Sequence, residues 1–195
     1  MDTNTRPRPR PLSLLLSIAL ACAAAPMAVN AGDTPQRATV PAANAASLDR
    51  PETLESLKPG QYLWEPQRAT RGPVVMVVSL PEQRMHVYRD GVRIGVTTIS
   101  SGKAGKETPT GNFEILQKKR EHYSNLYNNA PMPFMQRLTW DGIALHAGAL
   151  PGYPASNGCV RLPKAFAALL FEHTERGGRV VVADAASHGL AVVHP

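Results

Sequence analysis

The 195-residue sequence has only two cysteines, Cys22 and Cys159, and neither belongs to a Cys-x-x-Cys pair. A scaffold built on several disulfides is therefore excluded, and the absence of a His-Glu-x-x-His run leaves no zinc-site motif. The apolar run from Leu12 to Ala25 ends at Pro26, short of the roughly 20 residues that a membrane-spanning helix needs. No nucleotide-binding loop or flavin motif is present either, so we expect no metal and no other cofactor.

Acidic residues are in the minority, with 15 Asp and Glu against 21 Lys and Arg, which gives a net charge of +6. This balance suits an anionic surface or substrate, but charge alone does not indicate nucleic acid, and we expect no nucleic-acid partner. Hydrophobic residues make up 43% and charged residues 18% of the chain. That composition is typical of one globular domain accompanied by some non-globular sequence.

Residues 1–31 have the organisation of a signal peptide. A cationic start that includes Arg6 precedes the apolar run, and Val29-Asn30-Ala31 is a small-residue cleavage site. We expect export to the periplasm, cleavage, and no stable membrane insertion afterwards. An uncleaved membrane anchor and a lipidated Cys22 are the alternatives. Cleavage would leave Cys159 as a lone cysteine in an oxidising compartment, without an internal partner for a disulfide.

The rest of the chain divides into a linker, a domain and a tail. Residues 32–72 are rich in Ala, Pro, Thr and Asn without a sustained period, which is typical of a linker. Within it, Pro51–Leu57 is a short helical patch and Tyr62–Trp64 is amphipathic; these segments either dock on the domain or belong to a flexible tether. The ordered domain is expected over residues 73–184, followed by a C-terminal tail at 185–195.

Alternating and β-branched patterns predict a domain made mainly of strands. Asp90-Gly91 predicts a hairpin turn with positive φ, and one helix is expected over residues 163–176, with a proline in its first turn and Gly177-Gly178 as its stop. Residues 118–139 are too long and irregular for a hairpin turn, which favours a binding loop or lid. The expected strands are 74–80, 85–88, 92–99, 112–117, 142–146 and 179–183.

The candidate chemistry lies between Leu145 and Leu162. His146 ends a predicted strand, and Cys159 follows a Gly- and Pro-rich loop of twelve residues that can fold back on itself. A thiol attacks as thiolate, and a free pKa of ~8.5 leaves only a minority ionised at neutral pH, so a neighbouring imidazole is needed. We therefore predict that Cys159 is a nucleophile and His146 its base. The alternative is a small, buried, apolar cysteine.

The turn Ser156-Asn157-Gly158 before the cysteine predicts an oxyanion site. A Gly-rich turn leaves backbone N–H groups free to point inward, so the amides of Gly158 and Cys159 are the expected donors, with the Asn157 side chain as a further one. Arg161 lies on the side of the thiol if the chain there is extended. The alternatives are that it binds a substrate carboxylate, that it lowers the thiol pKa, or that it forms a structural ion pair.

The run Ser-Asn-Gly-Cys-Val-Arg-Leu at 156–162, with Leu-His-Ala-Gly at 145–148, resembles the signature of the L,D-transpeptidase catalytic domain, also called the YkuD domain. Thr-Pro-Thr-Gly-Asn-Phe at 108–113 resembles the strand entry of that family, and Pro-Met-Pro-Phe at 131–134 resembles its pre-histidine loop. The resemblance covers about residues 73–184. One departure is Asn157, which stands where the family usually has histidine.

The resemblance implies a mainly β fold of two sheets with one helix next to the cysteine. It also implies that Cys159 acylates on the peptidoglycan tetrapeptide stem after meso-diaminopimelate and releases D-alanine, with His146 as base and then acid and the backbone carbonyl of Ala147 orienting the imidazole. An amine acceptor then resolves the thioester, commonly to form a wall cross-link; a protein acceptor is possible. An L,D-carboxypeptidase using the same cysteine and a non-catalytic peptidoglycan-binding module are the alternatives.

Overall fold

The structure, a computed structural model, describes residues 48–184. The predicted signal peptide with Cys22, the upstream part of the predicted linker, and the tail at 185–195 lie outside the described residues. No helix between residues 48 and 184 is both long enough and apolar enough to cross a bilayer.

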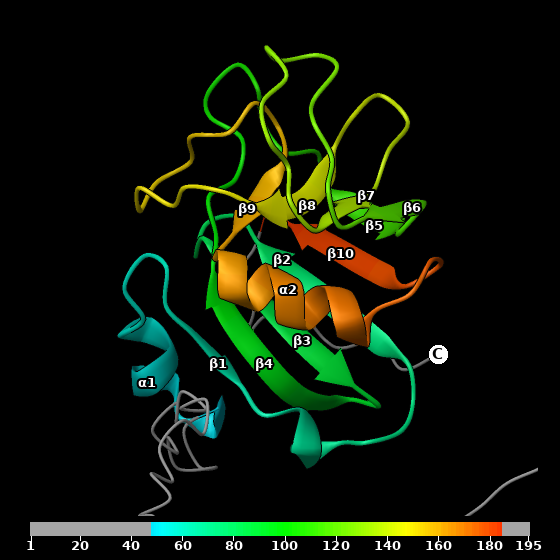
Figure 1. The fold of residues 1–195 in the computed structure, drawn as a ribbon. Helices are drawn as coiled ribbons and strands as arrows, with labels where there is room; N and C mark the ends of the chain where they lie inside the picture. Colours follow the sequence, from blue (N-terminus) through cyan, green and yellow to red (C-terminus); the bar gives the residue numbers. More distant parts are fainter. Residues whose placement is uncertain (1–47, 185–195) are drawn as a thin grey trace, which may run out of the picture. The chain divides into compact units, whose positions relative to one another are not determined.

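Two β-sheets contain most of the regular secondary structure of the described chain (Figure 1). The larger has six strands in the order β1-β4-β3-β2-β10-β5, and the smaller has four in the order β6-β7-β8-β9. This mainly β, two-sheet architecture confirms the expected fold class. The strands are β1 Tyr62–Trp64, β2 Val74–Ser79, β3 Arg84–Arg89, β4 Val92–Thr98, β5 Gly111–Glu114, β6 Gln117–Lys119, β7 Met135–Arg137, β8 Ala144–Ala147, β9 Val160–Leu162 and β10 Arg179–Ala183.

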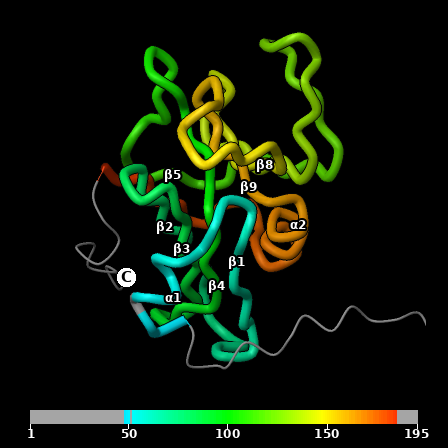
Figure 2. Tube along the Cα trace, turned by 90° about the vertical axis from the view of Figure 1, so that its left-hand side faces the viewer, coloured from blue at the N-terminus to red at the C-terminus, as the bar shows by residue number. Residues whose placement is uncertain are grey.

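The main core lies where the helix α2 (Lys164–His173) meets the two sheets. Figures 1 and 2 both show α2 against one face of the large sheet. Phe166 of this helix is fully buried, and its ring lies 5.4 Å from that of Tyr62 and 5.5 Å from that of Trp64. Leu145 and Val160 of the small sheet belong to the same core. The strands that carry the candidate site are therefore fixed against the helix.

The described residues upstream of residue 73 contact the predicted domain. β1 pairs antiparallel with β4, Tyr62 lying opposite Thr97, and the short helix α1 (Pro51–Glu55) and the 3-10 helix η2 (Pro66–Arg68) flank it. Tyr62–Trp64 therefore docks on the domain and is not part of a flexible tether. The composition around these residues resembles a linker, but the aromatic rings of β1 gain their burial from α2, a hundred residues downstream.

The strand expected at 112–117 is two strands in two different sheets. β5 pairs with β10 in the large sheet, whereas β6 pairs with β7 in the small one. Between them Ile115 is buried, and its amide donates to the carbonyl of Gly178 at 2.9 Å. The sequence pattern conceals this crossing, because a residue that joins two sheets is buried just as a strand residue is. The predicted loop at 118–139 therefore contains most of β6 and all of β7.

The observed helix α2 is shorter at both ends than the helix predicted over residues 163–176. Pro163 is the N-cap rather than a first-turn residue, and the last helical residue is His173. Thr174 ends the helix, since its side-chain oxygen donates to the carbonyl of Leu170 at 2.8 Å and its backbone is extended. By contrast, the β3–β4 hairpin is as expected, with Asp90 and Gly91 at φ values of 49° and 76°.

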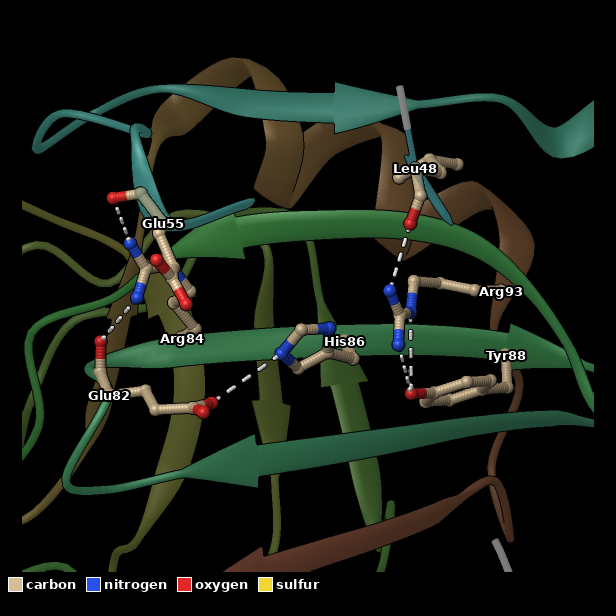
Figure 3. Close-up of polar contacts among 7 residues, drawn as sticks. All are labelled: Leu48, Glu55, Glu82, Arg84, His86, Tyr88 and Arg93. Atoms are coloured by element: carbon tan, nitrogen blue, oxygen red, sulfur yellow. Dashed lines mark hydrogen bonds and ion pairs between the residues drawn. The ribbon is translucent and has the colours of Figure 1, made fainter. Parts of the chain in front are cut away.

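Two arginines fasten the upstream segment to the outer face of the large sheet (Figure 3). Arg84 of β3 donates to the carbonyl of Glu55 at 2.8 Å, and Arg93 of β4 donates to the carbonyl of Leu48 at 2.8 Å. Arg93 also reaches the hydroxyl of Tyr88 at 3.3 Å. Both arginines contact the upstream segment at a backbone carbonyl, so these two hydrogen bonds do not require a particular side chain at residue 48 or 55.

Between these arginines lies a buried histidine. His86 is 1% exposed, its two ring nitrogens have no hydrogen-bond partner, and the Glu82 carboxylate lies 3.8 Å from Nε2 (Figure 3). Burial lowers the pKa of His86 to about 4; Arg93 and Arg84 lower it too, while Glu82 opposes them. The imidazole is therefore neutral at neutral pH.

The pKa of His86 predicts a loss of stability in mild acid. The folded pKa is below the ordinary value of 6.5, so the unfolded chain binds more protons between those values and the free energy of unfolding falls as pH drops from 6.5 to about 4. At about 1.4 kcal/mol per pKa unit, the loss is roughly 3 kcal/mol. In H86F, whose apolar ring needs no hydrogen bond, urea unfolding at pH 7 and pH 4.5 is expected to show a smaller decline. An identical decline in both proteins would contradict this.

Candidate active site

The site is built on two parallel strands of the small sheet. β8 and β9 pair with Leu145 opposite Val160 and His146 opposite Arg161. Side chains alternate along a strand, so Arg161, and Cys159 two residues before it, project to the same face as His146. The chain at Arg161 is extended, as its expected position beside the thiol requires.

These side chains line a common cavity of about 500 Å³. The long loop supplies Tyr127 and 131–133 to its wall, consistent with the expected binding loop. A volume of this size is typical of a small-ligand site. Six of the seven predicted site residues line it, Gly158 being the exception: His146, Ala147, Ser156, Asn157, Cys159 and Arg161.

The imidazole of His146 is oriented by its own neighbour. Nδ1 lies 2.8 Å from the carbonyl oxygen of Ala147, the contact that the resemblance implied. A carbonyl can only accept, so in the neutral ring Nδ1 carries the hydrogen and Nε2 keeps a lone pair. Burial lowers the pKa of His146 to about 4; Ala147 opposes this shift, while Arg161 and His122 add to it. The structure therefore holds a neutral imidazole whose Nε2 is unprotonated.

The sulfur of Cys159 is protonated at rest. Burial raises its pKa, against opposing effects from the Ala144 amide, Arg161 and Arg137. The thiol donates to the carbonyl of Gly142 at 3.5 Å. A resting thiolate is thus not favoured, because the sulfur and the imidazole are both withdrawn from water and each shift favours the uncharged form.

A hydroxyl inside the turn fixes the chain before the cysteine. Ser156 is 1% exposed; its Oγ donates to the carbonyl of Cys159 at 2.5 Å and accepts from the amide of Gly158 at 3.0 Å. The Gly158 amide, an expected oxyanion donor, is therefore engaged within the turn. Gly158 has a φ of +114°, so a side chain there is disfavoured by backbone strain, and Ile143, whose Cδ1 would lie 2.8 Å from a Cβ, would have to shift.

A second brace comes from a threonine fifty residues upstream. Thr108 Oγ1 donates to the carbonyl of Gly158 at 2.8 Å and accepts from the amide of Gly102 at 2.8 Å. Ser100 and Arg161 exchange two backbone hydrogen bonds of 3.0 and 3.1 Å. The sequence pattern identifies Thr108 only as a strand entry, since no local signal reveals a partner so distant in the chain.

Arg161 has no ion pair and no side-chain hydrogen bond within residues 48–184. The alternative of a structural ion pair is therefore not observed in this part of the chain. The aliphatic part of its side chain packs on Gly148, where a Cβ would lie 3.0 Å from its Cγ and Cδ. The guanidinium is thus available to an anionic ligand of the cavity.

On another side of the thiol lies a cavity of about 30 Å³, lined among others by His122, Arg137 and Gly142. Sequence patterns give no sign of it, since His122 and Arg137 come from a loop and a strand that approach the sulfur only in the folded chain. Among the described residues there is no group of three or more His, Cys, Asp or Glu side chains that could hold a metal ion.

The fold and the motif agree with the comparisons to known proteins. Solved structures of L,D-transpeptidases from Stackebrandtia nassauensis (30% identity, TM-score 0.53), Mycobacterium tuberculosis (25%, 0.54) and Xylanimonas cellulosilytica (27%, 0.52) are similar to this chain. The alignments cover 59%, 56% and 57% of this chain and 57%, 57% and 61% of those chains, respectively, so less than two thirds of each relative is spanned.

No curated protein sequence matches the chain. The L,D-transpeptidase catalytic domain (YkuD) family matches residues 73–182, which include both sheets except β1 and part of β10, together with the whole candidate site. The chain belongs to the L,D-transpeptidase catalytic domain family.

Proposed function

We propose that this protein is an exported L,D-transpeptidase that uses Cys159 as its nucleophile on peptidoglycan stem peptides. The observation that carries the proposal is the common cavity, in which the thiol, the unprotonated Nε2 of His146 and the unpaired Arg161 meet. Members of this family act on peptidoglycan, outside the cytoplasm. The signal-like residues 1–31 support export to the periplasm.

Acylation starts from a neutral pair. As the sulfur attacks the carbonyl between diaminopimelate and D-alanine, its proton moves to Nε2 of His146, so that an imidazolium forms only as negative charge develops on the carbonyl oxygen. The C–N bond then breaks, the imidazolium gives its proton to the leaving amine, and D-alanine departs. A thioester on Cys159 and a neutral His146 remain.

Transfer repeats these steps with an acceptor amine. The amine attacks the thioester, loses a proton to His146, and the C–S bond breaks as the sulfur regains a proton. With the Gly158 amide engaged by Ser156, the oxyanion donors are the amide of Cys159 and the side chain of Asn157. Arg161 binds the stem carboxylate next to the scissile bond.

Hydrolysis of the same thioester is a second candidate outcome. The cavity of about 30 Å³ beside the sulfur exceeds the roughly 10–15 Å³ that one water molecule requires, and His122, Ser124 and Arg137 give it polar walls. Analysing the products with and without an acceptor amine separates the two: cross-linked product identifies a transferase, and free tripeptide alone identifies an L,D-carboxypeptidase.

Replacing the sulfur tests the nucleophile. On incubation with a disaccharide tetrapeptide, the protein is expected to gain the mass of the stem minus D-alanine on Cys159, as seen by mass spectrometry. C159A should show no adduct, while K103Q, an exposed substitution outside the cavity, should react normally. Full adduct formation in C159A would refute the assignment. A thiol that neither the stem nor a maleimide modifies at neutral pH would support a non-catalytic wall-binding module.

The raised thiol pKa predicts little thiolate at neutral pH. In the ultraviolet difference spectrum between the protein and C159A, which cancels tyrosine ionisation, thiolate absorbance is expected only above pH 9.0, because burial raises the Cys159 pKa above that value. The reason is that burial disfavours the charged sulfur and His146, with a pKa of about 4, is neutral and offers no cationic partner. A thiolate signal already constant from about pH 5 to 8 would reveal a resting ion pair instead.

Arg161 is expected to control stem affinity through a carboxylate. Loss of a charge-assisted hydrogen bond of about 1.5–3 kcal/mol should lower kcat/KM of R161Q by roughly 10- to 100-fold. The matched control is a stem whose terminal carboxylate is amidated. This stem should be poor for the unmodified protein and should lose little more in R161Q. Equal losses with both stems would mean that Arg161 acts on the thiol rather than on the carboxylate.

A further inference from the structure

A second cavity, of about 530 Å³, shares no lining residue with the catalytic one. Its walls come from residues 70–74, from Arg89 at the end of β3, and from residues 172–179, where α2 ends and β10 begins (Figure 1). Lys164, the first residue of α2, lines the catalytic cavity, and His173, the last, lines the second. With a rise of 1.5 Å per residue, the helix separates the two cavities by about 14 Å.

Four arginines line this second cavity. Arg71, Arg176 and Arg179 are exposed, and none of the three has an ion pair or a side-chain hydrogen bond within the described chain. Arg89 donates to the carbonyl of Ala69 at 3.3 Å. Guanidinium groups around one cavity repel one another and bind carboxylates in a bidentate geometry, so an anionic group placed among them is favoured.

The cavity also contains negative charge. Glu172 and Glu175 line it, but Glu172 pairs with Arg120 at 2.7 Å, which leaves Glu175 without an ion pair among the described residues. The negative end of the α2 dipole is compensated as well, because Lys118 Nζ donates to the carbonyl of Phe171 at 2.6 Å. A ligand with carboxylates and one ammonium group matches this charge pattern better than a polyphosphate does.

We propose that the second cavity binds a further peptidoglycan stem, with its carboxylates on Arg71 and Arg179 and the diaminopimelate ammonium on Glu175. The identity of the ligand rests on the proposed function. A stem that reacts at Cys159 must place its scissile bond at the sulfur, so the second cavity takes a different stem of the same wall.

Two stem sites on one domain make binding to polymeric wall bivalent. Once one stem is bound, the other site meets its ligand at an effective concentration set by the spacing of stems on the glycan, and the overall affinity exceeds that of either site. Loss of the second cavity therefore weakens binding to the polymer but leaves acylation by a soluble single stem unchanged.

The test uses C159A as background, so that no turnover occurs, and measures binding to purified insoluble peptidoglycan. R71Q/R179Q removes two positive charges from the cavity, and R50Q/K58Q removes two from exposed positions elsewhere. We expect binding to fall at least about tenfold in R71Q/R179Q and to stay unchanged in R50Q/K58Q. Unchanged binding in R71Q/R179Q, or an equal loss in both variants, would overturn the proposal.

Two further measurements keep the outcomes distinct. Competition with soluble tetrapeptide should release C159A from the wall, whereas inorganic phosphate at equal concentration should not; release by phosphate alone would identify a general anion site and refute the stem assignment. With Cys159 intact, R71Q/R179Q should form the acyl-enzyme at the normal rate. If the unmodified protein forms no acyl-enzyme but R71Q/R179Q still loses wall binding, the catalytic proposal fails and the binding site stands.

Discussion

The parallel pairing of β8 with β9 is the constraint on which the site depends. It sets His146 opposite Arg161 and thereby puts the thiol, the imidazole and the guanidinium on one face. Parallel neighbours require a crossover, which here is the twelve-residue loop between His146 and Cys159 instead of a helix. A loop of that length needs external support, and the hydroxyls of Thr108 and Ser156 supply it by binding the backbone on either side of the sulfur.

Burial sets the electrostatics of the pair. The same removal from water raises the pKa of Cys159 and lowers that of His146, so the uncharged pair is the stable one. The positive charge of Arg161 lowers the pKa of both groups, so it favours the neutral form of His146 and the thiolate form of Cys159. The site thus combines a resting state without buried ions with a cation that favours the thiolate as it forms.

Features determined by nearby residues could be predicted from the sequence. The Asp90-Gly91 hairpin, the last strand and the residues of the cysteine motif are local patterns, and the structure has them where they were expected. The docking of Tyr62–Trp64, the crossing at Ile115 and the Thr108 brace depend on partners far along the chain, which no local pattern specifies. The neutral thiol depends on burial, which only the assembled fold determines. The amide of Gly158 is engaged by Ser156 two residues earlier, but the sequence motif does not reveal this hydrogen bond.

The attachment of the upstream segment has an evolutionary consequence. Arg84 and Arg93 donate hydrogen bonds to the main-chain oxygens of Glu55 and Leu48, and every amino acid carries such an oxygen. Substitutions at exposed positions of that segment therefore leave these two hydrogen bonds in place. Replacement of either arginine removes one of them. These two hydrogen bonds are in this way independent of side-chain identity at residues 48 and 55, whereas the packing of Tyr62 and Trp64 on Phe166 depends on their aromatic rings.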